Sequence, residues 1–246
     1  MIKIFKPIAF AAFAVLMIIP MVVAATENET AVEKVFTAVE NDPASIINNY
    51  LQAIGGIEKI KSLKSAVIVM ESKFNGATIR LTDLVDQANE KYLQEVVFMG
   101  NVASKTVLAD GRATVSAMGQ SRPVPEQMLK NLKARTYVVP EAHYREWGYT
   151  MEYKGTQKIN KEEAHRILVK TPSGMEMTEY YSVKTGLKLR SVSSAAGEFN
   201  YSNYKAVDGV LWPMNVSLQN PNMPFTLEAD VVSVLFNQEL DPADFR

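Results

Sequence analysis

Residue types that usually carry catalysis or bind metals are sparse in this sequence. It has no cysteine and only two histidines, His143 and His165, and neither has a partner at a recognised metal-binding spacing. No G-x-S-x-G, H-E-x-x-H or glycine-rich phosphate loop is present. The acidic pair Glu162-Glu163 lies in a lysine-rich stretch that is typical of a solvated turn. The sequence therefore favours a non-catalytic protein without metal or other cofactor, although carboxylates from distant strands could meet, as in a glycosidase.

Methionine is the one side chain that the sequence uses unusually often. Nine of its twelve methionines follow residue 25. The thioether side chain is unbranched and polarizable, which suits an adaptable apolar surface such as a ligand cavity. Met175 and Met177 would share one strand face, as a copper(I) thioether site requires, but no nearby histidine or cysteine accompanies them. The methionines therefore indicate an adaptable core or a cavity wall.

The period of the apolar residues predicts a β-rich protein from Ala66 onward. Apolar and polar residues alternate there, with turn residues at short intervals, as in an antiparallel meander. Asp110-Gly111 is the clearest hairpin signal, because a type I′ turn needs positive φ at both positions. The expected strands are Ala66–Phe74, Thr78–Val85, Lys91–Met99, Ala103–Leu108, Ala113–Met118, Thr150–Lys158, His165–Thr171, Met175–Val183, Leu187–Ser193, Glu198–Tyr204, Leu211–Leu218 and Phe225–Leu235. About a dozen strands strain a flat sheet, so this one should curl strongly or close partway.

Helices are expected before the strands and at one interruption between them. Residues 30–33 match a capping box, and a second helix begins at Asp42-Pro43 and ends at Gly55-Gly56. Pro123–Ala134 is expected to form a helix with one apolar face, followed by a loop as far as Trp147. This segment lies between two blocks of strands, so it could cover the concave side of a curled sheet as a plug or lid. Ordinary core packing is the alternative.

The first 25 residues predict export. Lys3 and Lys6 precede an uncharged stretch over residues 7–23, and Ala24-Ala25 offers a cleavage site, which is the pattern of a secretory signal peptide. An uncleaved membrane helix is the alternative, because the apolar stretch approaches the roughly 20 residues that span a bilayer. Without both lysines, 24 basic residues would face 27 acidic ones, so no positive field favours nucleic acid. We expect cleavage near Ala24 or Ala25 and a mature protein outside the cytoplasm.

Several segments resemble one family of exported domains. The sequences that carry the resemblance are Ile46–Gly56, Thr185–Arg190, Phe199–Tyr204, Asp208–Pro213 and the closing Phe245. They resemble the outer-membrane lipoprotein-sorting proteins, which are periplasmic lipoprotein carriers of the LolA/LolB type, over roughly Pro43 to Arg246. The resemblance implies a strongly curved antiparallel sheet around helices, with an apolar cavity for acyl chains. Tyr204, Gly209 and Pro213 match structural positions of that family and not catalytic ones.

The sequence thus predicts a mainly β protein whose curved antiparallel sheet forms an incomplete β-barrel with helices on its concave face. We divide it into a signal peptide (1–25), a polar linker with an N-terminal helix (26–42) and a single LolA-like half-barrel domain (43–246). We expect a monomeric periplasmic protein of the Gram-negative cell envelope that binds a lipid or lipoprotein acyl chain, or another apolar ligand, without catalysis. Membrane contact would be transient, and an envelope protein is a further expected partner.

The expected cavity residues follow from alternation within each strand and from the apolar face of the Pro123–Ala134 helix. The expected ligand-binding residues are Met70, Leu81, Val97, Met99, Met128, Leu132, Trp147, Met177 and Leu189. Two other functions stay open. A filled concave face would indicate a protein-interaction module of the cell envelope, whereas a cleft with converging acids or a histidine would indicate a hydrolase.

Overall fold

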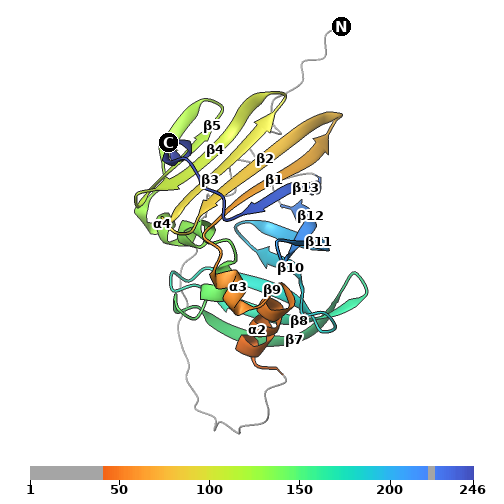
Figure 1. The fold of residues 1–246 in the computed structure, drawn as a ribbon. Coiled ribbons are helices and arrows are strands. Elements are labelled where there is room, and N and C mark those ends of the chain that lie inside the picture. The colour runs from red at the N-terminus through yellow and green to blue at the C-terminus, as the bar shows by residue number, and fades with distance from the viewer. Residues whose placement is uncertain (1–40, 221–224) are drawn as a thin grey trace.

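The structure is a computed structural model that describes residues 41–220 and 225–246, apart from the side chain of Gln127. The expected signal peptide, its cleavage site and the helix expected near Thr30 lie outside the described residues. The described chain forms one curved sheet, with short helices at one end and across its opening (Figure 1).

Thirteen strands form the sheet, and every neighbouring pair is antiparallel. The strands are β1 (Ser65–Phe74), β2 (Ala77–Asp86), β3 (Lys91–Phe98), β4 (Asn101–Ala109), β5 (Arg112–Ala117), β6 (Gln120–Pro123), β7 (Thr150–Ile159), β8 (Glu162–Lys170), β9 (Glu176–Ser182), β10 (Lys188–Ser193), β11 (Gly197–Val207), β12 (Val210–Gln219) and β13 (Leu227–Phe236). Their order in the sheet is β6-β5-β4-β3-β2-β1-β13-β12-β11-β10-β9-β8-β7. The meander predicted from the sequence is confirmed.

The order of the strands explains why the barrel is incomplete. β1 pairs with β13, so the first and last strands meet in the middle of the sheet, and β6 and β7 become its two edges. A closed barrel would need β6 to pair with β7. Residues 124–149 instead run from one edge to the other as α4 (Glu126–Leu132), η1 (Lys133–Thr136) and η2 (Pro140–His143). We call this crossing segment the lid.

The start of the lid differs from the sequence-based expectation. A helix was expected from residue 123, but Gln120–Pro123 forms the short edge strand β6 and the helix starts at Glu126. The four exposed residues of β6 show no apolar alternation that could have revealed a strand. A tight turn at Met118-Gly119 pairs them with β5.

The helix that the sequence predicted between Asp42 and Gly55 is confirmed. α2 (Pro43–Ala53) is capped by Asp42, whose Oδ2 accepts a hydrogen bond from the Ser45 amide at 3.0 Å. Gly55 and Gly56, both at positive φ, separate it from α3 (Ile57–Lys61). A Cβ at Gly55 would lie 2.8 Å from the carbonyl oxygen of Gly209, so only glycine allows the helix end to approach the β11–β12 turn this closely.

The main core lies between α2, the lid and the concave face of the sheet. α2 contributes Ile46 and Leu51, the lid contributes Leu132, and Ile68 and Ile167 come from strands far apart in the sheet. These side chains are almost fully buried. The packing confirms the prediction that helices occupy the concave face.

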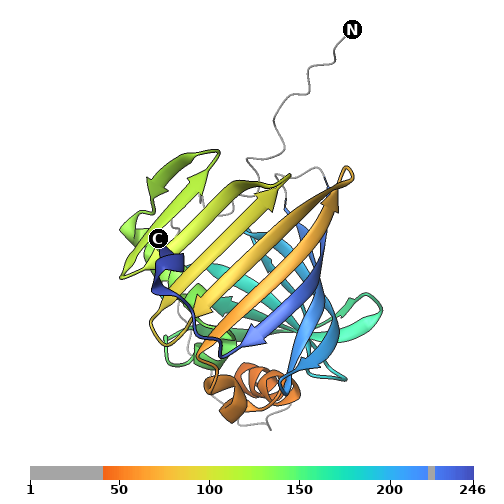
Figure 2. The same ribbon diagram turned by 45° about the horizontal axis from the view of Figure 1, so that its top comes forward.

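The convex face carries smaller apolar clusters. The C-terminal turn η3 (Pro242–Phe245) places Phe245 against Leu93 and Val107, where the end of the chain crosses β3 and β4 (Figure 2). Within the described residues, no helix is long and apolar enough to span a bilayer.

Candidate functional site

The concave face holds a second apolar cluster, separate from the main core, which we call the rim cluster. Its buried members are Ile79, Val96, Leu218 and Leu227, and its half-buried members are Phe74, Leu81, Phe98, Phe199 and Phe225. All of them lie on strands except Phe225, which precedes β13. The rings of Phe74 and Phe225 are 4.6 Å apart between centroids. No helix residue of the described chain contributes to this cluster, and its aromatic side chains stay partly exposed.

Strand register joins the rim cluster to the main core. Met70 of β1 lies opposite Leu81 of β2, which lies opposite Val96 of β3, so the three side chains share one face. Met70 packs against the main core and Leu81 against the rim cluster. Ser72, two residues beyond Met70 on the same face, is 6% exposed, and its Oγ has no hydrogen-bond partner within residues 41–220 and 225–246. The concave face is therefore continuous, with one buried unpaired hydroxyl in its apolar part.

The structure brings several of the predicted ligand-binding residues together on the concave side. Met177 of β9 and Trp147 of the lid both pack against the main core with Met70. Leu132 is 1% exposed and is a full member of that core, so it is a packing residue of the lid. Met128 of α4 is half-buried.

Three predicted residues lie elsewhere. Val97 lies opposite Arg80 on the convex face, because it follows the concave Val96 directly in β3. Met99 is outside the strand, in the β3–β4 turn, and is 72% exposed. Leu189 packs with the convex cluster around Tyr180. These three placements correct the expected concave set. For Val97 and Met99 the reason is local: Val96 to Met99 is apolar throughout, so alternation alone could not assign the face.

Leu189 faces outward because β10 is irregular. Its pairing with β9 shifts between Lys188 and Arg190, which turns Lys188 inward and Leu189 outward. Lys188 is only 6% exposed. The sequence analysis had placed Leu189 on the concave face.

The inward Lys188 belongs to a buried ionic network that the sequence analysis missed. Its Nζ donates to Glu141 Oε1 of the lid and, at 2.6 Å, to Glu179 Oε1 of β9. Glu179 also accepts hydrogen bonds from the hydroxyls of Tyr144, at 3.0 Å, and Tyr181, at 2.5 Å. The network therefore ties the lid to β9 and β10. One feature of the sequence could have indicated the network. Met177, Glu179 and Tyr181 alternate along one strand face, so an acid lies between two largely apolar side chains.

The electrostatics of the network favour the charged form of Lys188. Burial alone would lower the pKa of its ammonium group, but the carboxylates of Glu141 and Glu179 hold that pKa above its ordinary value. Burial and the nearby Glu179 carboxylate raise the pKa of the Tyr144 and Tyr181 hydroxyls, which therefore act as hydrogen-bond donors. The arrangement can hold a lid in place, but its groups are closed off from solvent.

A second polar contact joins the lid to the other side of the sheet. Arg135 of η1 donates to the Tyr92 hydroxyl at 3.4 Å, and Tyr92 donates to Asp83 Oδ1 at 2.8 Å. Gln94 donates to the same Asp83 oxygen at 3.1 Å. Burial raises the pKa of the Asp83 carboxyl against the lowering effect of Arg135. The lid is thus anchored to both sides of the curved sheet, on β2–β3 and on β9–β10.

The two histidines contact neighbouring polar and aromatic side chains. His143 Nδ1 lies 2.9 Å from Glu146 Oε2, and its ring stacks on Trp147 at 5.4 Å between centroids. His165 faces the Tyr153 hydroxyl at 3.5 Å, and partial burial lowers its pKa. Within residues 41–220 and 225–246, no group of three or more His, Asp or Glu side chains could hold a metal ion.

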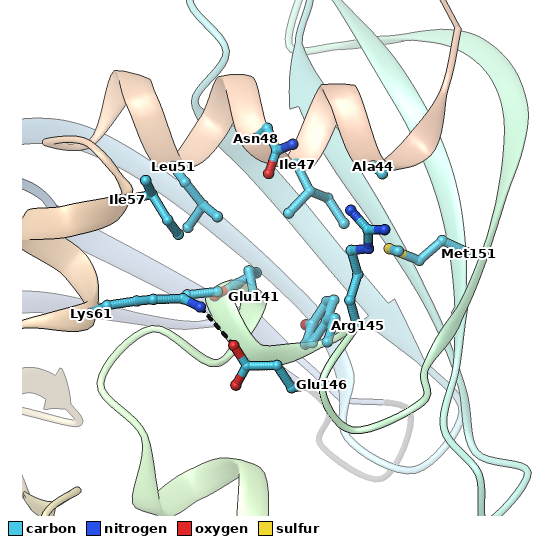
Figure 3. A pocket seen from close by; sticks show the side chains of 12 residues that line it. Ala44, Ile47, Asn48, Leu51, Ile57, Lys61, Glu141, Arg145, Glu146 and Met151 are labelled. Carbon is cyan, nitrogen blue, oxygen red and sulfur yellow. Dashed lines mark hydrogen bonds and ion pairs between the residues drawn. The ribbon is translucent and has the colours of Figure 1, made fainter.

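A cleft of about 280 Å³ opens between α2, α3 and the lid. Ile47, Leu51 and Met151 form its apolar part, and the ion pair between Lys61 and Glu146, 2.6 Å long, bounds one side (Figure 3). This volume is below that of a typical ligand pocket. The rim cluster presents more apolar side chains than the cleft and is the better candidate for an apolar ligand.

Comparison with known proteins identifies the fold. No protein-family model matches the sequence, and no curated protein matches it. Three solved structures are similar in fold. An outer membrane lipoprotein-sorting protein domain from Vibrio parahaemolyticus is 10% identical, with a TM-score of 0.53 over 82% of this chain and 95% of that one.

The other two structures agree with the first. A LolA superfamily protein from Nitrosomonas europaea is 11% identical, with a TM-score of 0.54 over 83% of this chain and 97% of that one. A DUF1329 family protein from Desulfovibrio piger is 12% identical, with a TM-score of 0.53 over 83% of this chain and 98% of that one. The curved sheet and its helices therefore have the fold of the LolA superfamily and of lipoprotein-sorting domains, as the sequence resemblance had indicated.

Proposed function

We propose that this protein is an exported, non-catalytic carrier that binds an acyl chain or a similar apolar ligand on the concave face of its sheet. The observation that carries the proposal is the rim cluster, in which five half-buried apolar side chains lie together without a covering helix from the described chain. A folded protein that leaves such a surface partly exposed commonly uses it to bind a partner.

The chemistry of the rim cluster fits an acyl chain. Its exposed edges are aromatic rings and a leucine, which contact a flexible hydrocarbon without hydrogen bonds. Each methylene that leaves water would contribute about 0.8 kcal/mol to binding. No cation of the described chain belongs to the cluster, so the binding energy would come from the chain of a ligand and not from its head group.

The similar structures and the first residues support the same function. One of the similar structures is named an outer membrane lipoprotein-sorting protein domain and another a LolA superfamily protein, and the first name refers to lipoproteins. The pattern of residues 1–25 supports export, with cleavage near Ala24 or Ala25. We expect a monomer in the periplasm, and intact-mass measurement of envelope fractions tests the cleavage. A full-length species held in the inner membrane would contradict it.

A fluorescent fatty acid tests the binding site. Leu81→Glu places a charge in the rim cluster. A bound acyl chain would cover this charge and leave it without water or an ionic partner, so we expect at least about tenfold weaker probe binding. Val97→Glu is the matched control, because Val97 lies one strand away on the convex face, opposite Arg80. Both variants are first checked for thermal stability.

The results separate the carrier from its alternative. Weaker binding by Leu81→Glu with near-normal binding by Val97→Glu supports the carrier. Equal binding by both variants contradicts the proposed site. If the wild-type protein shows no saturable binding of any acyl probe, the carrier proposal fails and an envelope protein-interaction module is favoured.

A further inference from the structure

Two exposed methionines lie side by side at one end of the strands, along the edge that the β1–β2, β3–β4 and β5–β6 turns form. Met99 is in the β3–β4 turn and is 72% exposed, and Met118 is in the β5–β6 turn and is 60% exposed. The Met118 amide donates to the carbonyl oxygen of Ala103 at 3.3 Å, which places the second turn beside the start of β4. Val102, also on β4, is 53% exposed between them. We call these three residues the methionine rim.

The geometry of these turns does not call for methionine. Met99 and Met118 both have φ of 51°, and each is followed by a glycine at positive φ. Asn75, Asp110 and Asp208 occupy the same position in three other turns, with φ of 49°, 51° and 48°. Asparagine and aspartate tolerate this conformation better than other side chains, whereas methionine strains it. The chain thus uses suitable residues in three turns and exposed apolar ones in two adjacent turns.

The surroundings of the methionine rim are basic. Its two turns and the neighbouring β1–β2 turn cover residues 72–79, 98–104 and 116–123, and these contain no aspartate or glutamate. They contain Lys73 and Arg122, although the whole protein has a net charge of −1. Neither cation forms an ion pair with a described residue. Apolar tips flanked by cations fit a surface that is apolar inside and negative outside, as an anionic lipid bilayer is.

The position of the methionine rim links it to the rim cluster. Phe98 directly precedes Met99, and Phe74 directly precedes the β1–β2 turn. Both phenylalanines belong to the rim cluster on the concave face. The three hairpin tips follow one another along the same edge of the sheet (Figure 2). A bilayer in contact with this edge would therefore meet the apolar end of the concave face.

We propose that the methionine rim inserts into the surface of an anionic lipid bilayer, with Lys73 and Arg122 contacting its head groups. Thioether side chains at two adjacent turns would enter the interface, while the strands behind them stay in water. The docked edge is the one at which the rim cluster opens. This inference does not depend on the proposed carrier function, because bilayer contact and acyl-chain binding are measured separately.

Cosedimentation with vesicles of phosphatidylethanolamine and phosphatidylglycerol tests the inference. The Met99→Asn, Met118→Asn double variant should lose at least about tenfold in vesicle affinity, because each methionine no longer enters the apolar layer. Asparagine suits the left-handed turn position, so thermal stability should stay the same or rise. Binding of a soluble fatty-acid probe should not change. Wild-type binding should weaken in high salt and on phosphatidylcholine vesicles, because both reduce the attraction of the cations.

Two single variants provide a gain-of-binding control. Asn75→Met adds a third methionine to the same edge and should strengthen vesicle binding. Asn160→Met makes the same exchange at φ of 49° in the β7–β8 turn, at the opposite ends of the strands, and should not.

Three results would overturn the inference. The first is equal vesicle binding by the wild type and the double variant. The second is a marked loss of stability in the double variant, because the methionines would then be part of the packing. The third is self-association of the wild type that the double variant abolishes without any vesicle binding, because the surface would then be an interface between copies of the chain.

Discussion

The two halves of the concave face are built in opposite ways. Beneath α2 and the lid, the core side chains are almost fully buried, and Lys188 pairs there with Glu141 and Glu179. In the rim cluster, the side chains come from strands and from Phe225 just before β13, and five of the nine stay partly exposed. The neighbouring Ser72 hydroxyl has no hydrogen-bond partner among the described residues. The half beneath α2 and the lid, with its buried side chains and paired charges, stabilises the fold. The other half carries the proposed binding surface, so substitutions should affect stability in the first and ligand binding in the second.

The largest expected effect is on the buried ionic network. Lys188→Met removes the cation that pairs with both Glu141 and Glu179, and both carboxylates stay buried. We expect the free energy of unfolding to fall by about 3–5 kcal/mol at neutral pH. The matched control is Lys170→Met, whose ion pair with Glu176 is 2.7 Å long but half-exposed on both sides, so its loss should lower the free energy of unfolding far less. Denaturant unfolding compares them, and equal losses would contradict a special role for the network.

The pH dependence of this contribution follows from the raised pKa of Lys188. A raised pKa in the folded state means that the stabilisation is complete below the ordinary value of 10.5 and is lost only as the pH rises through the folded value. The wild type should therefore keep this contribution throughout the neutral range and lose it in strong alkali. Lys188→Met lacks the ammonium group and should not show this loss in alkali.

The next largest effect compares one leucine from each half. Leu132→Ala opens a cavity in the main core and should cost about 2–5 kcal/mol, because that side chain is almost fully buried. Leu81→Ala should cost clearly less, because Leu81 is half-exposed in the rim cluster. Fatty-acid affinity should show the reverse order: Leu81→Ala should weaken it more than Leu132→Ala, provided that both variants are folded. Equal losses of stability would mean that the rim cluster is ordinary core.

These comparisons also show what the sequence could predict. Period-two alternation and turn residues such as Asp110-Gly111 were sufficient for the meander, and the Asp42 cap and Gly55-Gly56 were sufficient for α2, because these signals are local. β6 was missed because an exposed edge strand needs no apolar face.

The face of individual residues was harder to predict. Val97 lies in a continuous apolar run, and Leu189 lies beside a shift in register that no local pattern announces. The partners of Lys188 are 47 and 9 residues away, so its burial depends on the tertiary fold. Local patterns therefore located the elements of the site, but only pairing and packing could assign its side chains to a face.

A smaller effect is expected where the lid is anchored to β2 and β3. Burial raises the pKa of Asp83, so its ionised form is disfavoured in the folded protein, and stability falls as the pH rises through that pKa. Asp83→Asn keeps an oxygen that can accept from Tyr92 and Gln94, and it should raise the melting temperature at pH 7. The gain should shrink below pH 4, where the wild-type carboxyl is protonated. Asp110→Asn, at an exposed turn, is the control. A lower melting temperature for Asp83→Asn would show that its charge is needed by Arg135.

The smallest expected effect compares one serine from each half. Ser191 Oγ lies 3.0 Å from the Tyr201 hydroxyl, near the ionic network, whereas Ser72 Oγ is buried without a partner. Loss of a satisfied hydrogen bond costs about 1 kcal/mol, but removal of an unsatisfied buried hydroxyl is neutral or stabilising. Ser191→Ala should therefore lower the free energy of unfolding, and Ser72→Ala should leave it unchanged or raise it slightly. Denaturant unfolding at neutral pH measures both, and an equal loss in Ser72→Ala would mean that the rim half is as well satisfied as the half beneath the lid. Fatty-acid affinity adds a second reading, because weaker binding by a fully stable Ser72→Ala protein would place the hydroxyl in contact with the ligand.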